Sequence, residues 1–129
     1  MGRIVTQIHI SNFEDKTKSI DASALIDTGA AYLTLPAIWR DRLGELEKIA
    51  DIEVEMADQS VKKAGLYGPV RLQVSKFRKT FTEVLFLEME ANEDGYYEPL
   101  VGYIPLEQAG IAVDMLGHRL IQVKRADLK

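Results

Sequence analysis

One short stretch, residues 24–30, constrains this chain more than any other, because it places an acid and a glycine directly after an apolar run. Leu25 and Ile26 are typical of the end of a buried strand, and Gly29 permits a sharp turn or the close approach of another backbone. Asp27 is therefore a carboxylate at a buried strand end, with no base or cation beside it in the sequence. Such a charge is costly unless a second carboxylate shares one proton with it.

The motif at residues 27–30 (Asp-Thr-Gly-Ala) has no second copy in the chain, so a partner carboxylate has to come from a second chain. This motif resembles the active-site signature of the retropepsin-like aspartic proteases, whose single-lobe subunits pair to build one site. Residues 100–114 resemble the second signature of that family, with two apolar residues and a glycine followed by a short helix and a closing strand. With a candidate hairpin between the two motifs, the resemblance covers residues 4–123.

The resemblance implies an all-β, mainly antiparallel lobe with one or two short helices. It also implies a homodimer that hydrolyses a peptide or protein substrate with a shared-proton pair of Asp27 carboxylates and an activated water, without a cofactor. The resemblance implies that Asp27 is the catalytic acid and that Thr28, Gly29 and Ala30 support the active-site loop. It places Leu100, Val101 and Gly102 behind that loop. It also implies a flap that closes over the peptide, with a tip formed by Ala57, Asp58, Gln59 and Ser60.

A second hypothesis uses the same fold for a different function. The flap tip of the family is usually rich in glycine, whereas residues 57–60 contain none. The alternative is therefore a peptide-binding or dimerisation module with weak or no proteolysis. The intact motif at residues 27–30 favours the enzyme.

Length and composition set the remaining bounds. The 129 residues fit a single domain, residues 1–129, and are too few for a two-lobed protease. A net charge of −4 gives no electrostatic case for binding nucleic acid. The chain has no cysteine, which suits a reducing compartment, and no apolar run approaches the roughly 20 residues that span a bilayer. We therefore predict a cytoplasmic protein that contacts no membrane.

Other chemistries lack the residues that they need. The two histidines lie far apart and no cysteine accompanies them, so no metal site is predicted. The sequence contains no Gly-x-Ser-x-Gly motif and no phosphate-cradling glycine loop. Asp114 terminates a strand pattern and is interpreted as a turn former. Asp27 is thus the one acid to which we assign catalysis.

Alternating apolar residues predict a chain made mostly of short strands. Pro69 predicts an interruption between two of them, because proline cannot donate a hydrogen bond to a neighbouring strand. The strands are predicted over residues 4–10, 19–26, 32–35, 49–56, 61–66, 70–74, 80–87, 100–101, 111–113 and 120–123, and short helices over residues 36–43 and 106–109.

Overall fold

A computed structural model describes residues 3–123, so the ends of the predicted domain, residues 1–2 and 124–129, lie outside the described residues. The prediction of a mainly β fold with one or two short helices is confirmed. The elements are β1 (Val5–Asn12), β2 (Ser19–Ile26), β3 (Leu33–Pro36), the 3₁₀ helix η1 (Ala37–Leu43), β4 (Glu47–Glu55), β5 (Val61–Val74), β6 (Thr80–Leu87), β7 (Leu100–Val101), α1 (Tyr103–Ala109), β8 (Ile111–Asp114) and β9 (Arg119–Gln122).

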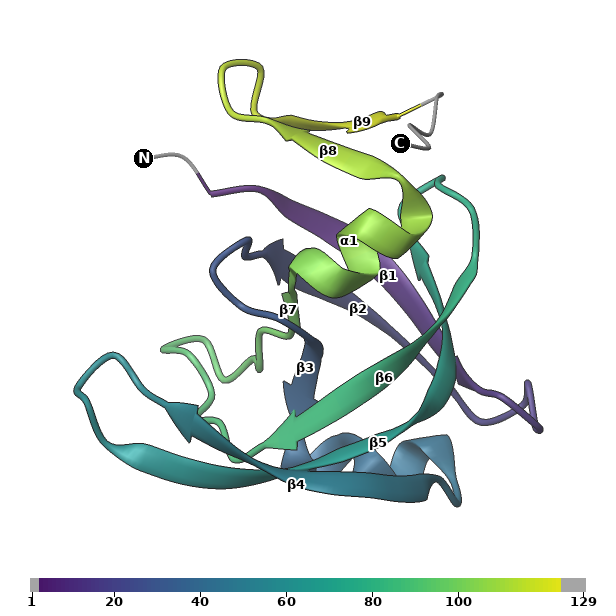
Figure 1. Ribbon diagram of the computed structural model, residues 1–129, viewed down its shortest axis with the longest axis vertical. Coiled ribbons are helices and arrows are strands. Elements are labelled where there is room, and N and C mark those ends of the chain that lie inside the picture. Colours follow the sequence, from purple (N-terminus) through teal and green to yellow (C-terminus); the bar gives the residue numbers. More distant parts are fainter. Residues whose placement is uncertain (1–2, 124–129) are drawn as a thin grey trace, which may run out of the picture.

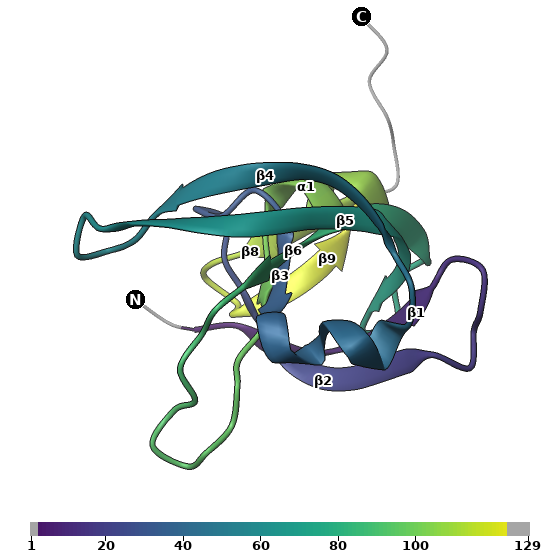
Figure 2. The ribbon, with the colours of Figure 1, turned by 90° about the horizontal axis from the view of Figure 1, so that it is seen from below.

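Six strands close into a barrel. Their order is β1-β2-β7-β3-β6-β5, and the pairing of β5 with β1 completes the ring. Most neighbours are antiparallel, whereas β2–β7 and β3–β6 are parallel. β4 pairs only with β5 and forms an edge outside the ring, and the β4–β5 hairpin projects beyond the barrel (Figures 1 and 2).

The prediction of two separate strands around Pro69 was wrong, because β5 runs unbroken from Val61 to Val74. The register against β6 shifts between Tyr67 and Val70, so the strand accommodates the proline at an irregularity in the ladder. Gly68, at a φ of +154°, takes a backbone conformation that favours glycine. The missing proline donor therefore coincides with a local register shift and does not end the strand.

The barrel interior holds the main hydrophobic core. Its fully buried side chains come from strands that are distant in sequence, including Ile10, Leu33, Leu72 and Val101. A smaller cluster lies under the hairpin, where Ala64 and three leucines pack against the apolar side of β4: Leu66, Leu85 and Leu87. This second cluster holds the hairpin against the barrel beside the loop that carries Asp27.

β8 and β9 form a separate two-stranded sheet at the end of the molecule away from the β4–β5 hairpin (Figure 1). Asp114 forms the turn between them, because its Oδ1 accepts the backbone N–H groups of Leu116 at 3.1 Å and Gly117 at 3.0 Å. Its Oδ2 accepts the Nε–H of Arg119 at 3.0 Å. These bonds, with that from Gly117 foremost, lower the pKa of the Asp114 carboxyl.

Replacing Asp114 with alanine is expected to destabilise the protein at about pH 7 and to have less effect in acid. A carboxyl whose pKa is lower in the folded state than in the unfolded state stabilises the protein at pH values above its unfolded pKa of about 3.9. This stability is lost as the pH falls through the lower pKa of the folded state. Urea unfolding of wild type and Asp114→Ala, at about pH 7 and in acid, measures the difference in unfolding free energy at each pH. Equal destabilisation at neutral and acid pH contradicts the prediction.

Candidate active site

Asp27 follows the last residue of β2 and is held there by backbone hydrogen bonds. Its N–H donates to the carbonyl of Val101 at 3.0 Å, which continues the parallel pairing of β2 with β7. Its Oδ1 accepts the N–H of Gly29 at 3.0 Å, and its carbonyl accepts the N–H of Ala30 at 3.1 Å. The chain therefore turns tightly around a half-buried carboxylate, with one carboxylate oxygen engaged by the loop itself.

Gly102 packs directly behind this loop. A Cβ at this position would lie 2.5 Å from the carbonyl oxygen of Ala30, 2.6 Å from the carbonyl carbon of Ala31 and 2.7 Å from the nitrogen of Tyr32. Three hydrogen bonds tie the same segments together: Gly102 N–H to Tyr32 O at 3.1 Å, Tyr103 N–H to Ala30 O at 2.9 Å and Ile104 N–H to Ala31 O at 3.0 Å. The backbone after β7 thus supports the Asp27 loop at a distance that only glycine permits.

A cleft of about 550 Å³ opens beside Asp27. We call it the Asp27 cleft; its walls are the loop residues Asp27, Gly29, Ala30 and Ala31, residues 52–57 of the β4–β5 hairpin, and the side chains of Tyr32, Thr34, Leu85, Leu87 and Leu100. The loop after β2 and the tip of the hairpin face the same side of the barrel (Figure 1). The hairpin therefore forms one wall of a cleft that has a carboxylate in the opposite wall.

The hairpin tip lies where the sequence pattern predicts it, at residues 57–60 between β4 and β5. Asp58 Oδ1 accepts the N–H of Ser60 at 2.9 Å and its hydroxyl at 2.5 Å, and the hydroxyl bond is the main cause of a lowered pKa of the Asp58 carboxyl. Gln59 takes the left-handed conformation, with a φ of +70°. Side-chain bonds and a strained residue thus form a tight turn that contains no glycine.

The structure brings together only some of the predicted site residues. Asp27, Gly29, Ala30, Ala57 and Leu100 line the Asp27 cleft. Val101 is buried beneath the loop. Thr28 is exposed and does not line the cleft, and neither do the tip residues Asp58, Gln59 and Ser60.

Sequence reasoning did not assign the hairpin strand itself to the site. Ile52, Val54 and Met56 pack against the small cluster under the hairpin and line the cleft, together with Tyr32 and Leu85. The alternation of apolar residues and acids in residues 52–56 was the available signal, because it predicts a strand with one apolar face. The pattern does not say that this face meets Asp27.

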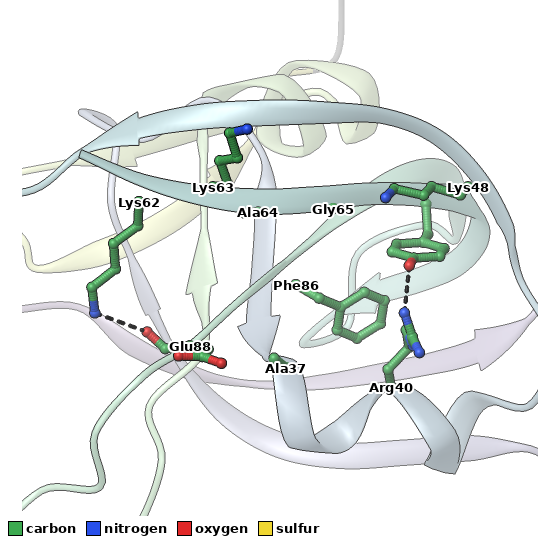
Figure 3. Close-up of a pocket in the computed structure, with 10 residues that line it drawn as sticks. Ala37, Arg40, Lys48, Lys62, Lys63, Ala64, Gly65, Phe86 and Glu88 are labelled. Atoms are coloured by element: carbon green, nitrogen blue, oxygen red, sulfur yellow. Dashed lines mark hydrogen bonds between the residues drawn. The ribbon is translucent and has the colours of Figure 1, made fainter.

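A second cavity, of about 570 Å³, lies between η1 and the β4–β5 hairpin (Figure 3). Four cations line it, but three of them are already engaged. Arg40 donates to the Tyr67 hydroxyl, Lys48 pairs with Asp51 at 2.6 Å, and Lys62 donates to the carbonyl of Glu88 at 3.4 Å. Its one carboxylate, Glu88, has no second acid or nucleophile beside it in the lining, so we place the candidate active site at Asp27.

Within residues 3–123, no group of three or more histidine, aspartate or glutamate side chains is arranged to hold a metal ion. Neither helix in the same range has the length and apolar character needed to cross a membrane. No protein-family model and no curated protein matches this sequence. The functional assignment therefore depends on the site itself.

Proposed function

We propose that this chain is a retropepsin-like aspartic endopeptidase that works as a homodimer. The observation that carries the proposal is the placement of Asp27 in the wall of a peptide-sized cleft, on a loop that Gly102 supports from behind. The residue types match the resemblance noted in the sequence, and the apolar wall opposite Asp27 suits the side chains of an extended peptide. A cytoplasmic location is part of the same proposal, since a cysteine-free chain suits a reducing compartment.

The proposed chemistry needs two copies of Asp27. A twofold axis places the same surface of each subunit against its copy, so the two carboxylates face each other. Like charges this close do not both ionise, and the pair holds one proton. The ionised member removes a proton from a trapped water, and the protonated member donates a hydrogen bond to the scissile carbonyl. Gly29 leaves room for the substrate backbone, and Thr28 hydrogen-bonds across the interface.

Exposed apolar side chains on the β8–β9 hairpin and at the start of β1 support self-association. Met115, Leu116, Ile121 and Val123, on or beside the β8–β9 hairpin, are all exposed, as is Val5 on β1. The start of β1 adjoins the Asp27 loop, because the carbonyl of Ile4 accepts the N–H of Ile26 at 2.9 Å. A second copy that covers this surface removes apolar area from water and brings the two loops toward one axis.

Activity per chain is expected to fall on dilution, as the subunits separate. Leu116→Ser should move this fall to higher protein concentration, because each buried leucine contributes about 1.5–3 kcal/mol to the association. Leu116 is 97% exposed in the single chain, so the change leaves the barrel core intact. Sedimentation and peptide cleavage over a dilution series measure both effects.

The matched control is Ile38→Ser, which alters an apolar residue that is 67% exposed but lies on η1. It should leave the dilution curve unchanged. Activity per chain that stays constant while sedimentation detects only monomer contradicts the dimeric site.

Digestion of a random peptide library, with and without a pepstatin-type inhibitor, tests the proposed function. Inhibitor-sensitive cleavage supports the endopeptidase. The glycine-free tip, with Gln59 in a strained conformation, favours one alternative, a peptide-binding module with little proteolysis. Binding of library peptides without cleavage supports that alternative.

A further inference from the structure

The charged residues that line the Asp27 cleft are all acidic. Besides Asp27, the residues that line it include Glu53 and Glu55, and no lysine, arginine or histidine is among them. Glu53 and Glu55 are both exposed, and neither forms an ion pair with another side chain in residues 3–123. An extended ligand beside this part of β4 therefore lies near two carboxylates that form no ion pair within the described residues.

These two glutamates lie on a strand with a free edge. β4 pairs with β5 alone, so the backbone groups on its other side have no strand partner among the described residues. Six consecutive residues, 52–57, line the Asp27 cleft, although successive side chains of a strand point to opposite faces. The cleft therefore runs along the free edge of β4, where a peptide can add as a further strand.

The side chains of β4 alternate in character along this edge. Ile52 and Val54 face the small apolar cluster, whereas Glu53 and Glu55 lie on the other face. On the paired side of β4, the register already places Lys63 opposite Glu53. In a peptide that pairs with the free edge, alternate side chains lie beside the apolar residues of β4 and the side chains between them lie beside the two glutamates. Opposite charges at such cross-strand positions are favourable.

We propose that the cleft selects cationic peptides, with lysine or arginine at two positions two residues apart and an apolar residue between them. Glu53 and Glu55 are the specificity-determining residues: they bind the two cations, while Ile52, Val54 and Met56 contact the apolar residue. This inference rests on the proposed function, because it names the substrate class of the same site. It concerns the selection of the peptide and assigns no chemical step to either glutamate.

A positional-scanning library first identifies the two peptide positions at which lysine is preferred. The test then compares two peptides of one apolar sequence that differ only in carrying Lys-x-Lys or Gln-x-Gln at these positions. Wild type is expected to cleave the lysine peptide with a kcat/KM about 2- to 25-fold higher at low salt, since each of two exposed ion pairs contributes a factor of about 1.4 to 5. Glu53→Gln/Glu55→Gln should reduce this ratio to about one. Added salt should reduce it in wild type, because the carboxylates are exposed and screened.

Glu47→Gln is the matched control, because Glu47 is an exposed glutamate on the same strand but outside the cleft. It should keep the preference of wild type. The substituted glutamates are exposed, so thermal unfolding should show all variants folded. Equal cleavage of the two peptides by wild type, or an unchanged preference in the double variant, overturns the proposal while leaving the endopeptidase intact.

A binding measurement separates this inference from the proposed function. Fluorescence anisotropy of the two labelled peptides with Asp27→Asn, with and without the double glutamate change, reports selection when no cleavage can occur. If wild type cuts neither peptide but Asp27→Asn binds the lysine peptide through Glu53 and Glu55, the selection stands and the proteolytic function fails. If neither cleavage nor glutamate-dependent binding of the lysine peptide occurs, the selection fails too.

Discussion

Asp27→Asn is expected to lower peptide cleavage by at least about 10²-fold while leaving the protein folded. General acid–base groups contribute about 10²–10⁴-fold, and an amide can neither remove a proton from water nor share one across a dyad. The side chain is half-buried, and its Oδ1 accepts one hydrogen bond from the N–H of Gly29. The Oδ1 of asparagine can accept the same bond, so the loop should keep its conformation. Cleavage rates and thermal unfolding of the two proteins measure both parts of the prediction.

Asp21→Asn is the matched control for this change. Asp21 lies on the same strand, β2, but it is exposed, pairs with His9 at 2.6 Å, and does not line the Asp27 cleft. Its replacement removes one carboxylate and should leave the cleavage rate close to that of wild type. An Asp27→Asn protein that cleaves peptides as fast as the control means that the aspartic mechanism is wrong.

Gly102→Ala is expected to produce the largest structural effect, because the new methyl group meets backbone and not a movable side chain. Three atoms of residues 30–32 lie within 2.7 Å of the Cβ position. Overpacking costs about 1–3 kcal/mol and occasionally more, and we expect the upper end of that range. The φ of Gly102 is −83°, which any residue adopts, so the loss comes from the clash alone. The loop that holds Asp27 has to move, so cleavage should also be lost under conditions in which the variant is folded.

The control is Gly95→Ala, in the loop between β6 and β7. Its added Cβ meets nothing within 4 Å, but its φ of +83° makes alanine strained by about 1–2 kcal/mol. This variant should therefore lose stability and keep its activity. Urea unfolding and kcat/KM, measured for both variants, separate a general loss of stability from displacement of the Asp27 loop. Full activity in folded Gly102→Ala would show that the contact does not position the carboxylate.

Predictions from the sequence were most accurate where structure depends on near neighbours. The strands predicted over residues 80–87 and 19–26 match β6 and β2 with their observed bounds. The interpretation of Asp114 as a turn former is confirmed by its bonds to Leu116 and Gly117. The local rule that proline interrupts a strand failed at Pro69. Although Pro69 has no N–H to donate, β5 pairs with neighbouring strands on both sides, and these pairs keep it continuous.

The sequence by itself determined that an acid stands at a strand end before a glycine, because that arrangement is local to residues 24–30. Only the tertiary structure decided what surrounds this acid. Gly102 lies behind the Asp27 loop because β7 pairs with both β2 and β3. Glu53 and Glu55 line the cleft along a free strand edge, because β4 pairs only with β5. The physical reason is that barrel closure brings together segments that are far apart in the chain. The local periodicity of a sequence does not predict which strands become neighbours.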